Sequence, residues 1–448
     1  MVPVISRTPR LILGGVTAFV VTVVGLAPFL ESQSRSIWSG DRFWSIGTIG
    51  AGVLAVVAVG TAAGLARTRI RTSALVAFGG LLLELPGLYY QAFEALSPVG
   101  AGVALGAITV TIPRMVRAAT VAGVLVAVFV SDALLDPTAV PRRYADYLAQ
   151  DTTQFQPPIV AATLIALGLT ALTALVWWRS NADRHRDEPP ERMAVRPVVI
   201  SAVLTLMGVA VNWWITINTV WAAIPVVACA ILVTVIAARV LEKGGQILLM
   251  STAAAAMLAS AVANSLSASV STGASAPVPT AIFLTVLIIA AATLAAFRPS
   301  LVGGYIVLVV LSVAGIASYV ATTTFSSENA LSVSDVLIRI CGAGAAYTIV
   351  SAMQSEPART GASRLLVGLS VIFGPTALAL LVYPQFSYGW TDYTPITGAT
   401  TASRFEPSDD VLILNGTALV IVVVCAYASR RLRLISQSGP STPSVETL

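Results

Sequence analysis

Fourteen apolar runs, each long enough to form a helix across a lipid bilayer, dominate the 448-residue sequence. A membrane-spanning helix needs about 20 mostly apolar residues, and it satisfies all its backbone hydrogen bonds internally. Since 56% of the residues are hydrophobic and only 10% are charged, no large soluble domain fits between the runs. We therefore expect an all-α integral membrane protein with about 14 transmembrane helices. The runs cover residues 11–30, 43–65, 74–96, 98–113, 118–136, 158–178, 197–217, 219–240, 246–270, 278–297, 301–323, 333–354, 364–384 and 411–429.

The basic residues assign each loop to one side of the membrane. With the N-terminus inside, 20 of the 26 Lys and Arg residues fall in inside segments, five fall in outside loops, and Arg339 falls within a run. Short cytoplasmic loops carry such an excess of positive charge. The bias disappears if the short fourth run is deleted, so we retain that run. We predict a multi-pass protein of the cell membrane with both termini cytoplasmic, and we expect no nucleic-acid partner because the basic residues form no stripe.

Two long outside loops, at about 136–158 and 384–410, indicate an internal repeat. The first follows the fifth run, and the second follows the thirteenth, which is the fifth of a final group of six. Parallel six-helix repeats occur in transporters, which bind substrate near the membrane midplane between the repeats. The predicted division is an N-terminal six-helix bundle at 1–178, a cytoplasmic linker at 179–196, an inserted helix pair at 197–240, a C-terminal six-helix bundle at 246–430 and a cytoplasmic tail at 431–448.

Ionisable and amide side chains within apolar runs are candidates for a substrate or proton pathway, because each is costly to place in hydrocarbon. Asp335 and Arg339 are four residues apart in the twelfth run, so they share a helix face and can pair. Glu84 lies ten residues into the third run. Each candidate also has a structural interpretation, such as snorkelling, helix capping or hydrogen bonding between helices. The remaining candidates are Asn264, Asp132 and Gln91.

The sequence shows no residue set for metal or nucleotide chemistry. The only histidine, His185, lies in the charged inside linker, and the three cysteines lie singly in separate apolar runs. The only lysine, Lys243, is not part of a phosphate-binding Gly-rich loop. We therefore expect no metal site, no cofactor and no enzymatic activity.

Three short segments can be compared with a known pattern. Gly64–Arg71 reads GLARTRIR, residues 96–102 read LSPVGAG, and residues 122–125 read AGVL. The first segment shares the Leu-Ala pair and the arginines of the pattern G-x-L-A-D-R-x-G-R-R but lacks its acidic residue. The second segment has glycines but lacks the arginine followed by Gln-Gly that is usual at this position of the pattern. The third segment lacks the Gly-Pro pair that antiporters with this pattern contain.

The chain resembles the major facilitator superfamily, in its fourteen-span drug:proton antiporter branch. The shared features are the span count, the inside termini, the central linker, the inserted helix pair and the long loop before the last span. The resemblance implies two bundles that enclose a central cavity. It also implies that the twelfth run lines this cavity and that the third run is peripheral.

The leading functional hypothesis is a secondary active transporter that exports or exchanges a small amphipathic solute by alternating access, with protons as a candidate coupling ion. A flippase for a lipid-linked precursor is one alternative, although its extra helix pair would follow twelve core helices, and here the connection 324–332 is short. A membrane glycosyltransferase is another, although Glu31 and Asp41 lie ten residues apart in a short first outside loop. A transport-inactive scaffold with a facilitator-like fold is a third.

Overall fold

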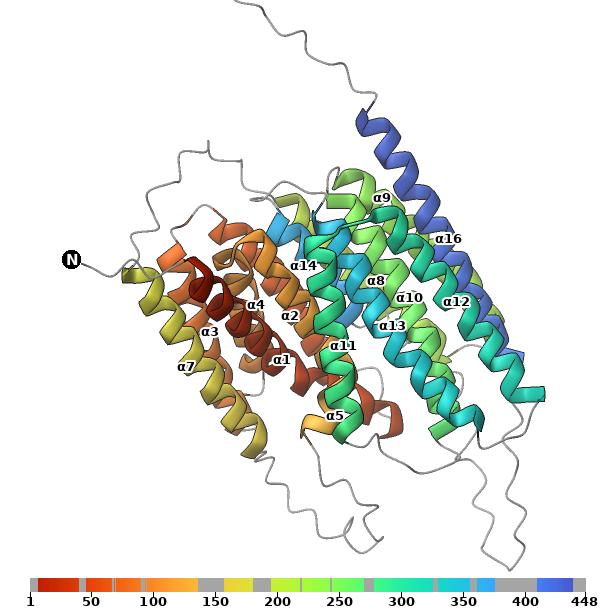
Figure 1. The fold of residues 1–448 in the computed structure, drawn as a ribbon, viewed down its shortest axis with the longest axis horizontal. Helices are drawn as coiled ribbons and strands as arrows, with labels where there is room; N and C mark the ends of the chain where they lie inside the picture. The colour runs from red at the N-terminus through yellow and green to blue at the C-terminus, as the bar shows by residue number, and fades with distance from the viewer. Residues whose placement is uncertain are drawn as a thin grey trace, which may run out of the picture.

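The described residues of the computed structural model are 7–39, 46–66, 68, 70–89, 93, 95–135, 157–179, 195–217, 220–241, 244–269, 278–324, 329–354, 361–374 and 409–437. Within these ranges the chain forms fourteen α-helices and no strand (Figure 1). The helices are α1 (Arg7–Ser39), α2 (Ile46–Leu65), α3 (Ile70–Tyr89), α4 (Leu96–Thr111), α5 (Ala118–Leu135), α7 (Pro157–Arg179), α8 (Val195–Ile217), α9 (Val220–Val240), α10 (Gly245–Ser269), α11 (Val278–Phe297), α12 (Leu301–Thr324), α13 (Asn329–Gln354), α14 (Gly361–Phe373) and α16 (Asp409–Gln437), with a 3₁₀ helix, η2 (Arg114–Arg117), between α4 and α5.

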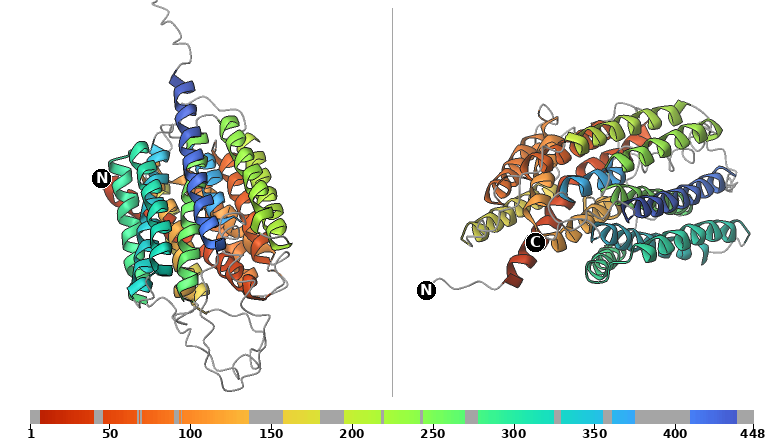
Figure 2. Two further views of the ribbon diagram at one scale, coloured as in Figure 1. Left: turned by 90° about the vertical axis from the view of Figure 1, so that its right-hand side faces the viewer. Right: turned by 90° about the horizontal axis from the view of Figure 1, so that it is seen from above.

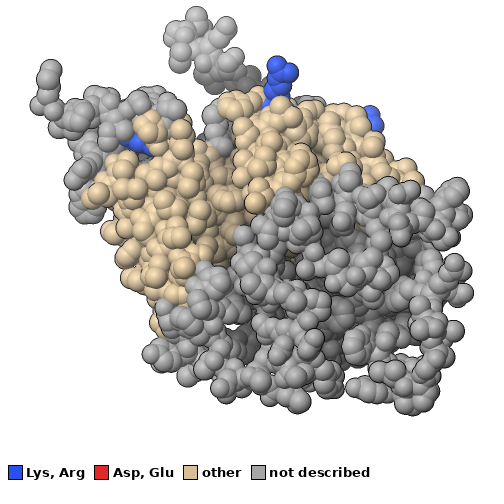
Figure 3. Space-filling view, turned by 60° about the horizontal axis from the view of Figure 1, so that its bottom comes forward, with Lys and Arg blue, Asp and Glu red and all other residues tan. Residues whose placement is uncertain are grey.

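Each predicted run overlaps one helix, including the short fourth run, which is α4; for the thirteenth run, 364–384, the helix α14 ends at Phe373 and residues 375–384 lie outside the described residues. By length and composition, Pro9–Phe29 is the one described stretch that is long and apolar enough to cross a membrane, and eleven further helices are apolar over described stretches of 10–17 residues. The described outer surface is apolar: Ile282, Phe283 and Val286 of α11 are 54–60% exposed. Figure 3 shows the described part of one face as almost wholly uncharged, with basic residues at its margin. The predicted all-α membrane fold is confirmed.

The helix ends differ from the apolar runs where proline or arginine is present. Pro98, expected to bound the fourth run, lies in the first turn of α4, where the missing N–H costs no intrahelical hydrogen bond. The helix α3 begins at Ile70 and ends at Tyr89, although the run suggested 74–96. Similarly, α16 continues through Arg430 and Arg431 to Gln437, because arginine can extend its charged end to the membrane surface while its backbone stays helical.

Six helix–helix contacts of the first half of the chain recur in the second half. The helix α1 contacts α4, α5 and α7, α4 contacts α2 and α3, and α3 contacts α7. The helix α10 contacts α13, α14 and α16, α13 contacts α11 and α12, and α12 contacts α16. If α1–α5 and α7 are numbered one to six, and α10–α14 and α16 likewise, the two lists name the same six pairs of positions. In Figure 1 the first set lies to the left and most of the second to the right. We propose that the two sets are the bundles of the predicted six-two-six division, which the repeated contacts support.

The helix pair α8 and α9 contacts both sets. The helix α8 packs on α2 and α14, and α9 packs on α10 and α16. At one point the approach is very close, since a Cβ on Gly52 of α2 would lie 2.6 Å from Thr205 Cγ2 of α8. Figure 2 shows this lime-green pair along one flank of the molecule. This position supports the proposal that α8 and α9 are an insertion beside the repeat.

Glycines allow close helix contacts in both sets, with backbone against backbone in the first and backbone against a leucine side chain in the second. A Cβ on Gly80 of α3 would lie 2.6 Å from the Ala104 backbone N of α4, and one on Gly100 of α4 would lie 2.5 Å from the Glu84 backbone N. In the second set, a Cβ on Gly344 of α13 would lie 2.5 Å from Leu311 Cδ1 of α12. Helices in lipid associate largely through such close van der Waals packing, because lipid tails are as apolar as the side chains.

The adjacent glycines Gly79 and Gly80 provide a matched test of this packing. We expect Gly80→Ala to destabilise the protein by about 1–3 kcal/mol, because the added Cβ forces α3 and α4 apart. A Cβ on Gly79 would have no atom within 4 Å, so Gly79→Ala should be neutral or stabilise the helix by about 0.5–1 kcal/mol. Thermal unfolding of the detergent-purified variants measures both effects. Equal melting temperatures for the two variants would contradict the close contact.

Candidate functional site

Glu84 is the one sequence candidate whose side chain is described. It is fully buried, and neither carboxyl oxygen has a hydrogen-bond partner. Its backbone touches Gly100 of α4, and its chain neighbours Leu81 and Leu85 belong to an apolar core shared by α1, α3, α4 and α7. A buried polar group without a partner costs free energy, so its presence needs an explanation.

Ser97 of α4 lies near Glu84 and was not singled out from the sequence. A Cβ on Gly87 would lie 2.8 Å from Ser97 Cβ, and Gly87 is three residues after Glu84, on the same side of α3. The Ser97 hydroxyl is buried and also has no partner. The interface between α3 and α4 therefore holds two polar groups about one helical turn apart, both available for a hydrogen bond, and the Glu84 carboxyl can also bind a proton.

Several other buried hydroxyl groups are satisfied by their own helix. Thr22, Thr109 and Thr111 each donate to the carbonyl oxygen four residues earlier, at 2.6–2.7 Å. These hydroxyls are engaged within the helix and do not need a solute. The contrast with Glu84 and Ser97 shows why burial of a polar residue alone does not identify a site.

The side chains of the other candidates lie outside the described residues. The backbone places Asp335 and Arg339 on α13, Asn264 on α10 and Asp132 on α5, and Gln91 is not described at all. Sequence position on each helix still defines which face these residues occupy.

The α13 face that carries Asp335 and Arg339 reaches the other helix set at Gly342. Gly342 is seven residues after Asp335 and three after Arg339, so the three share one face. A Cβ on Gly342 would lie 3.4 Å from Phe129 Cε2 of α5 and 3.4 Å from Ile288 Cδ1 of α11. The helices α5, α11 and α13 thus meet beside this face.

Asn264 lies on a face of α10 that packs on α16. Four residues before it, Ser260 donates a hydrogen bond to Asn415 Oδ1 of α16, and both side chains are buried. Asn415 was not singled out from the sequence, although a lone amide in an apolar run is the kind of signal that identified Asn264. This contact favours helix association as the role of that face.

Arg117 connects the two helix sets at the end where α14 begins. It is only 6% exposed, and its Nε donates to the Thr109 carbonyl oxygen at 3.2 Å. A Cβ on Gly361, the first residue of α14, would lie 3.2 Å from Arg117 Nη1. The sequence pattern marked Arg117 only as one of many inside charges, because its burial depends on the approach of α14.

The described residues contain no group of three His, Cys, Asp or Glu side chains placed to hold a metal ion. The three cysteines, Cys229, Cys341 and Cys425, are unpaired.

Comparison with known proteins places this architecture. No protein-family model matches the sequence, and no curated protein matches it. Among solved structures, the human organic anion transporter MFSD10 (TETRAN) is similar over 95% of this chain and 100% of its own, with a TM-score of 0.56 and 11% identity. The POT family transporter PepTSo is similar over 95% and 98%, with a TM-score of 0.51 and 12% identity. The proton:xylose symporter XylE is similar over 95% and 96%, with a TM-score of 0.51 and 11% identity.

The chain is thus a polytopic membrane protein whose described helices repeat one contact pattern. Its fold is similar to that of solved major facilitator superfamily transporters, in agreement with the sequence resemblance. At 11–12% identity this likeness concerns the fold.

The contact between Arg117 and α14 predicts that the start of α14 becomes more accessible when the Arg117 side chain is removed. We expect Arg117→Ala to speed the labelling of a cysteine at Ser363, a buried residue in the first turn of α14, by about tenfold for each 1.4 kcal/mol of lost contact. The measurement is the rate of maleimide labelling in inside-out vesicles. The matched control is Arg298→Ala, which removes an exposed arginine from the turn between α11 and α12. Equal rates in both backgrounds would contradict a stabilising contact between Arg117 and the start of α14.

Proposed function

We propose that the chain is a secondary active transporter that moves a small amphipathic solute across the cell membrane by alternating access, in export or exchange. The observation that carries this proposal is the crossed pairing of the two helix sets. The second helix of the first set, α2, contacts the fifth helix of the second set, α14. Reciprocally, the second helix of the second set, α11, contacts the fifth helix of the first set, α5. Such a symmetric junction lets two bundles rock about a central site.

The described functions of the structural neighbours agree with this class. They are an organic anion transporter, a POT family transporter and a proton:xylose symporter. Because their solutes differ, they support solute transport in general and leave the substrate of this chain open.

We place the solute and proton pathway at the α5–α13 junction. Asp132 is three residues after Phe129 on α5, and Arg339 is three residues before Gly342 on α13. A Cβ on Gly342 would touch Phe129, and in the predicted topology the two helices run in opposite directions. Asp132 and Arg339 then occupy the same level, one turn from this approach toward the outside. Both belong to the faces that meet there.

This register suggests that Arg339 exchanges partners during the transport cycle. When the outer ends of the bundles meet, Asp132 attracts Arg339 and leaves Asp335 free to accept a proton. When the outer ends separate, Arg339 returns to Asp335 on its own helix and the proton leaves. Glu84 and Ser97 lie between α3 and α4 of one set, so we assign them a secondary role.

The main test measures gradient-driven movement in proteoliposomes with an imposed pH gradient, using ethidium first in a panel of amphipathic ions. We expect Asp335→Asn to abolish gradient-driven movement while slow exchange of solute continues, because the proton site is lost but the bundles still rock. Glu84→Gln should have a smaller effect. Full activity of Asp335→Asn with loss only in Glu84→Gln would reverse this assignment. The absence of movement in every variant and in the unmodified protein would favour the inactive scaffold.

A double-mutant cycle tests the exchange of partners. We expect Asp132→Asn and Arg339→Gln each to lower gradient-driven transport at least tenfold, and the double variant to be no worse than either single one, since both changes break one interaction. Asp132→Asn combined with Glu84→Gln is the control pair, and these effects should multiply. Multiplicative effects in the Asp132 and Arg339 cycle would show that the two residues act independently.

A further inference from the structure

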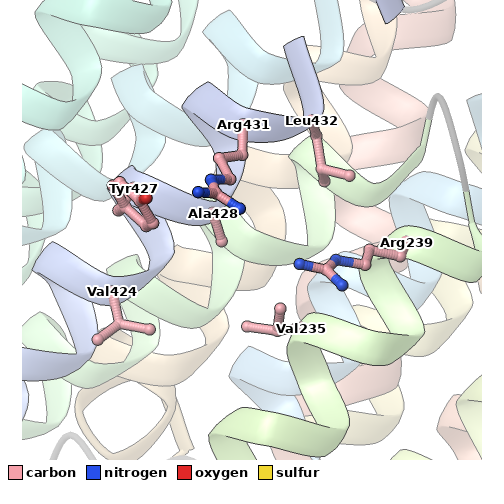
Figure 4. A pocket seen from close by; sticks show the side chains of 7 residues that line it. All are labelled: Val235, Arg239, Val424, Tyr427, Ala428, Arg431 and Leu432. Carbon is pink, nitrogen blue, oxygen red and sulfur yellow. The ribbon is translucent and has the colours of Figure 1, made fainter. Parts of the chain in front are cut away.

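A groove of about 190 Å³ opens between α9 and α16 at the end of the molecule where both helices terminate (Figure 4). Val235 and Arg239 of α9 line one side. The other side is a single face of α16 that runs from Val424 through Tyr427 and Ala428 to Arg431. This groove is separate from the α5–α13 junction, since α9 packs on α8, α10 and α16 and makes no comparable contact with α5 or α13 in the described part of the chain.

The polarity of the groove changes in the same direction along both helices. Arg239 follows Val235 by four residues, which is about 6 Å of helix, and Arg431 follows Val424 by seven, which is about 10 Å. In the proposed topology Val235, Val424 and Ala428 therefore lie deeper in the membrane than the two arginines, while Leu432 lies beside Arg431 at the arginine end. Figure 4 shows both guanidinium groups turned toward the space between the helices.

The charges in the groove have one sign. No acidic residue lines it. Arg239 makes no hydrogen bond or ion pair in the described part of the protein, and its side chain is exposed. The Arg431 guanidinium carbon lies 5.5 Å from the centre of the Tyr427 ring, a cation–π contact that orients it. Two cations at one end of an apolar groove match an anionic headgroup above a hydrocarbon chain.

We propose that this groove binds one anionic phospholipid, with its phosphate between Arg239 and Arg431 and an acyl chain along Val235, Val424 and Ala428. The groove is smaller than the roughly 300–1,000 Å³ of pockets that enclose a small molecule, so it holds the headgroup and the first part of one chain. In the topology proposed above, the lipid belongs to the cytoplasmic leaflet, which carries anionic lipids. The bound lipid fastens the inserted pair to α16.

Charge decides the selectivity of this site. Moving an acyl chain from bulk lipid to an apolar protein groove gains little, because both surroundings are hydrocarbon. Each arginine near the membrane surface should favour an anionic lipid about fivefold, so the pair should give on the order of 25-fold.

The test is native mass spectrometry of the detergent-purified full chain, titrated with palmitoyl-oleoyl phosphatidylglycerol. We expect the first lipid adduct to bind about 25-fold more weakly to the Arg239→Gln/Arg431→Gln double variant than to the unmodified protein. The matched control is Arg430→Gln, which removes the neighbouring exposed arginine of α16 that does not line the groove. Its affinity should stay within about twofold. An equal loss of lipid affinity in this control would show that surface charge in general, and not the groove, binds the lipid, and would overturn the proposal.

Two further arms identify the occupant. Palmitoyl-oleoyl phosphatidylcholine should bind at least tenfold more weakly than phosphatidylglycerol, and millimolar inorganic phosphate should not displace the lipid. Ala428→Trp fills the groove without changing charge and should abolish the tight adduct, whereas Val423→Trp, at a neighbouring exposed position outside the groove, should not. Displacement by inorganic phosphate, or an unchanged adduct in Ala428→Trp, would show that no acyl chain occupies the groove. A dimer lost in Ala428→Trp would show that a second copy of the chain occupies it.

Discussion

The close approach of helix backbones at glycine is the constraint on which the rest of this structure depends. In lipid the hydrophobic effect does not pull helices together, so association relies on van der Waals contact over surfaces that fit closely. Gly80 and Gly100 bring α3 against α4, and Gly368 brings α14 against α10, where its Cβ would lie 2.8 Å from Ile247 Cγ2. These contacts fix the spacing within each set, and the spacing then determines which polar side chains are buried.

Burial has different consequences for different polar groups in this scaffold. Threonine hydroxyls return to their own helix, and Ser260 pairs with Asn415 across two helices, so these groups stabilise packing. Glu84 and Ser97 remain without partners between α3 and α4. The junction of α5, α11 and α13 has a different character, because its described contacts, those of Gly342 with Phe129 and Ile288, are apolar.

Arginine serves two purposes at the ends of the helices. Arg117 is buried and lies against α14, whereas Arg239 and Arg431 are exposed and line the groove between α9 and α16. The difference follows from the neighbouring helices. Where another helix end covers the arginine, its hydrogen bonds go to protein carbonyl groups, and where only lipid is adjacent, its natural counterion is a lipid phosphate.

The sequence by itself determined the fourteen helices, because hydrocarbon thickness and backbone hydrogen bonding leave a long apolar run no other way to cross the bilayer. Even the short α4 followed from the alternation of basic loops. The candidate site could be predicted only in part. Asp335, Arg339 and Glu84 were visible as charges in apolar runs, but Ser97, Asn415 and Arg117 have common residue types whose importance depends on neighbours far along the chain. Only the tertiary structure decided that Glu84 has no partner, that Arg117 is covered by α14 and that Gly342 meets Phe129. Each of these facts depends on which helices lie side by side. Sequence periodicity defines a helix face, but it does not say which helix packs against that face.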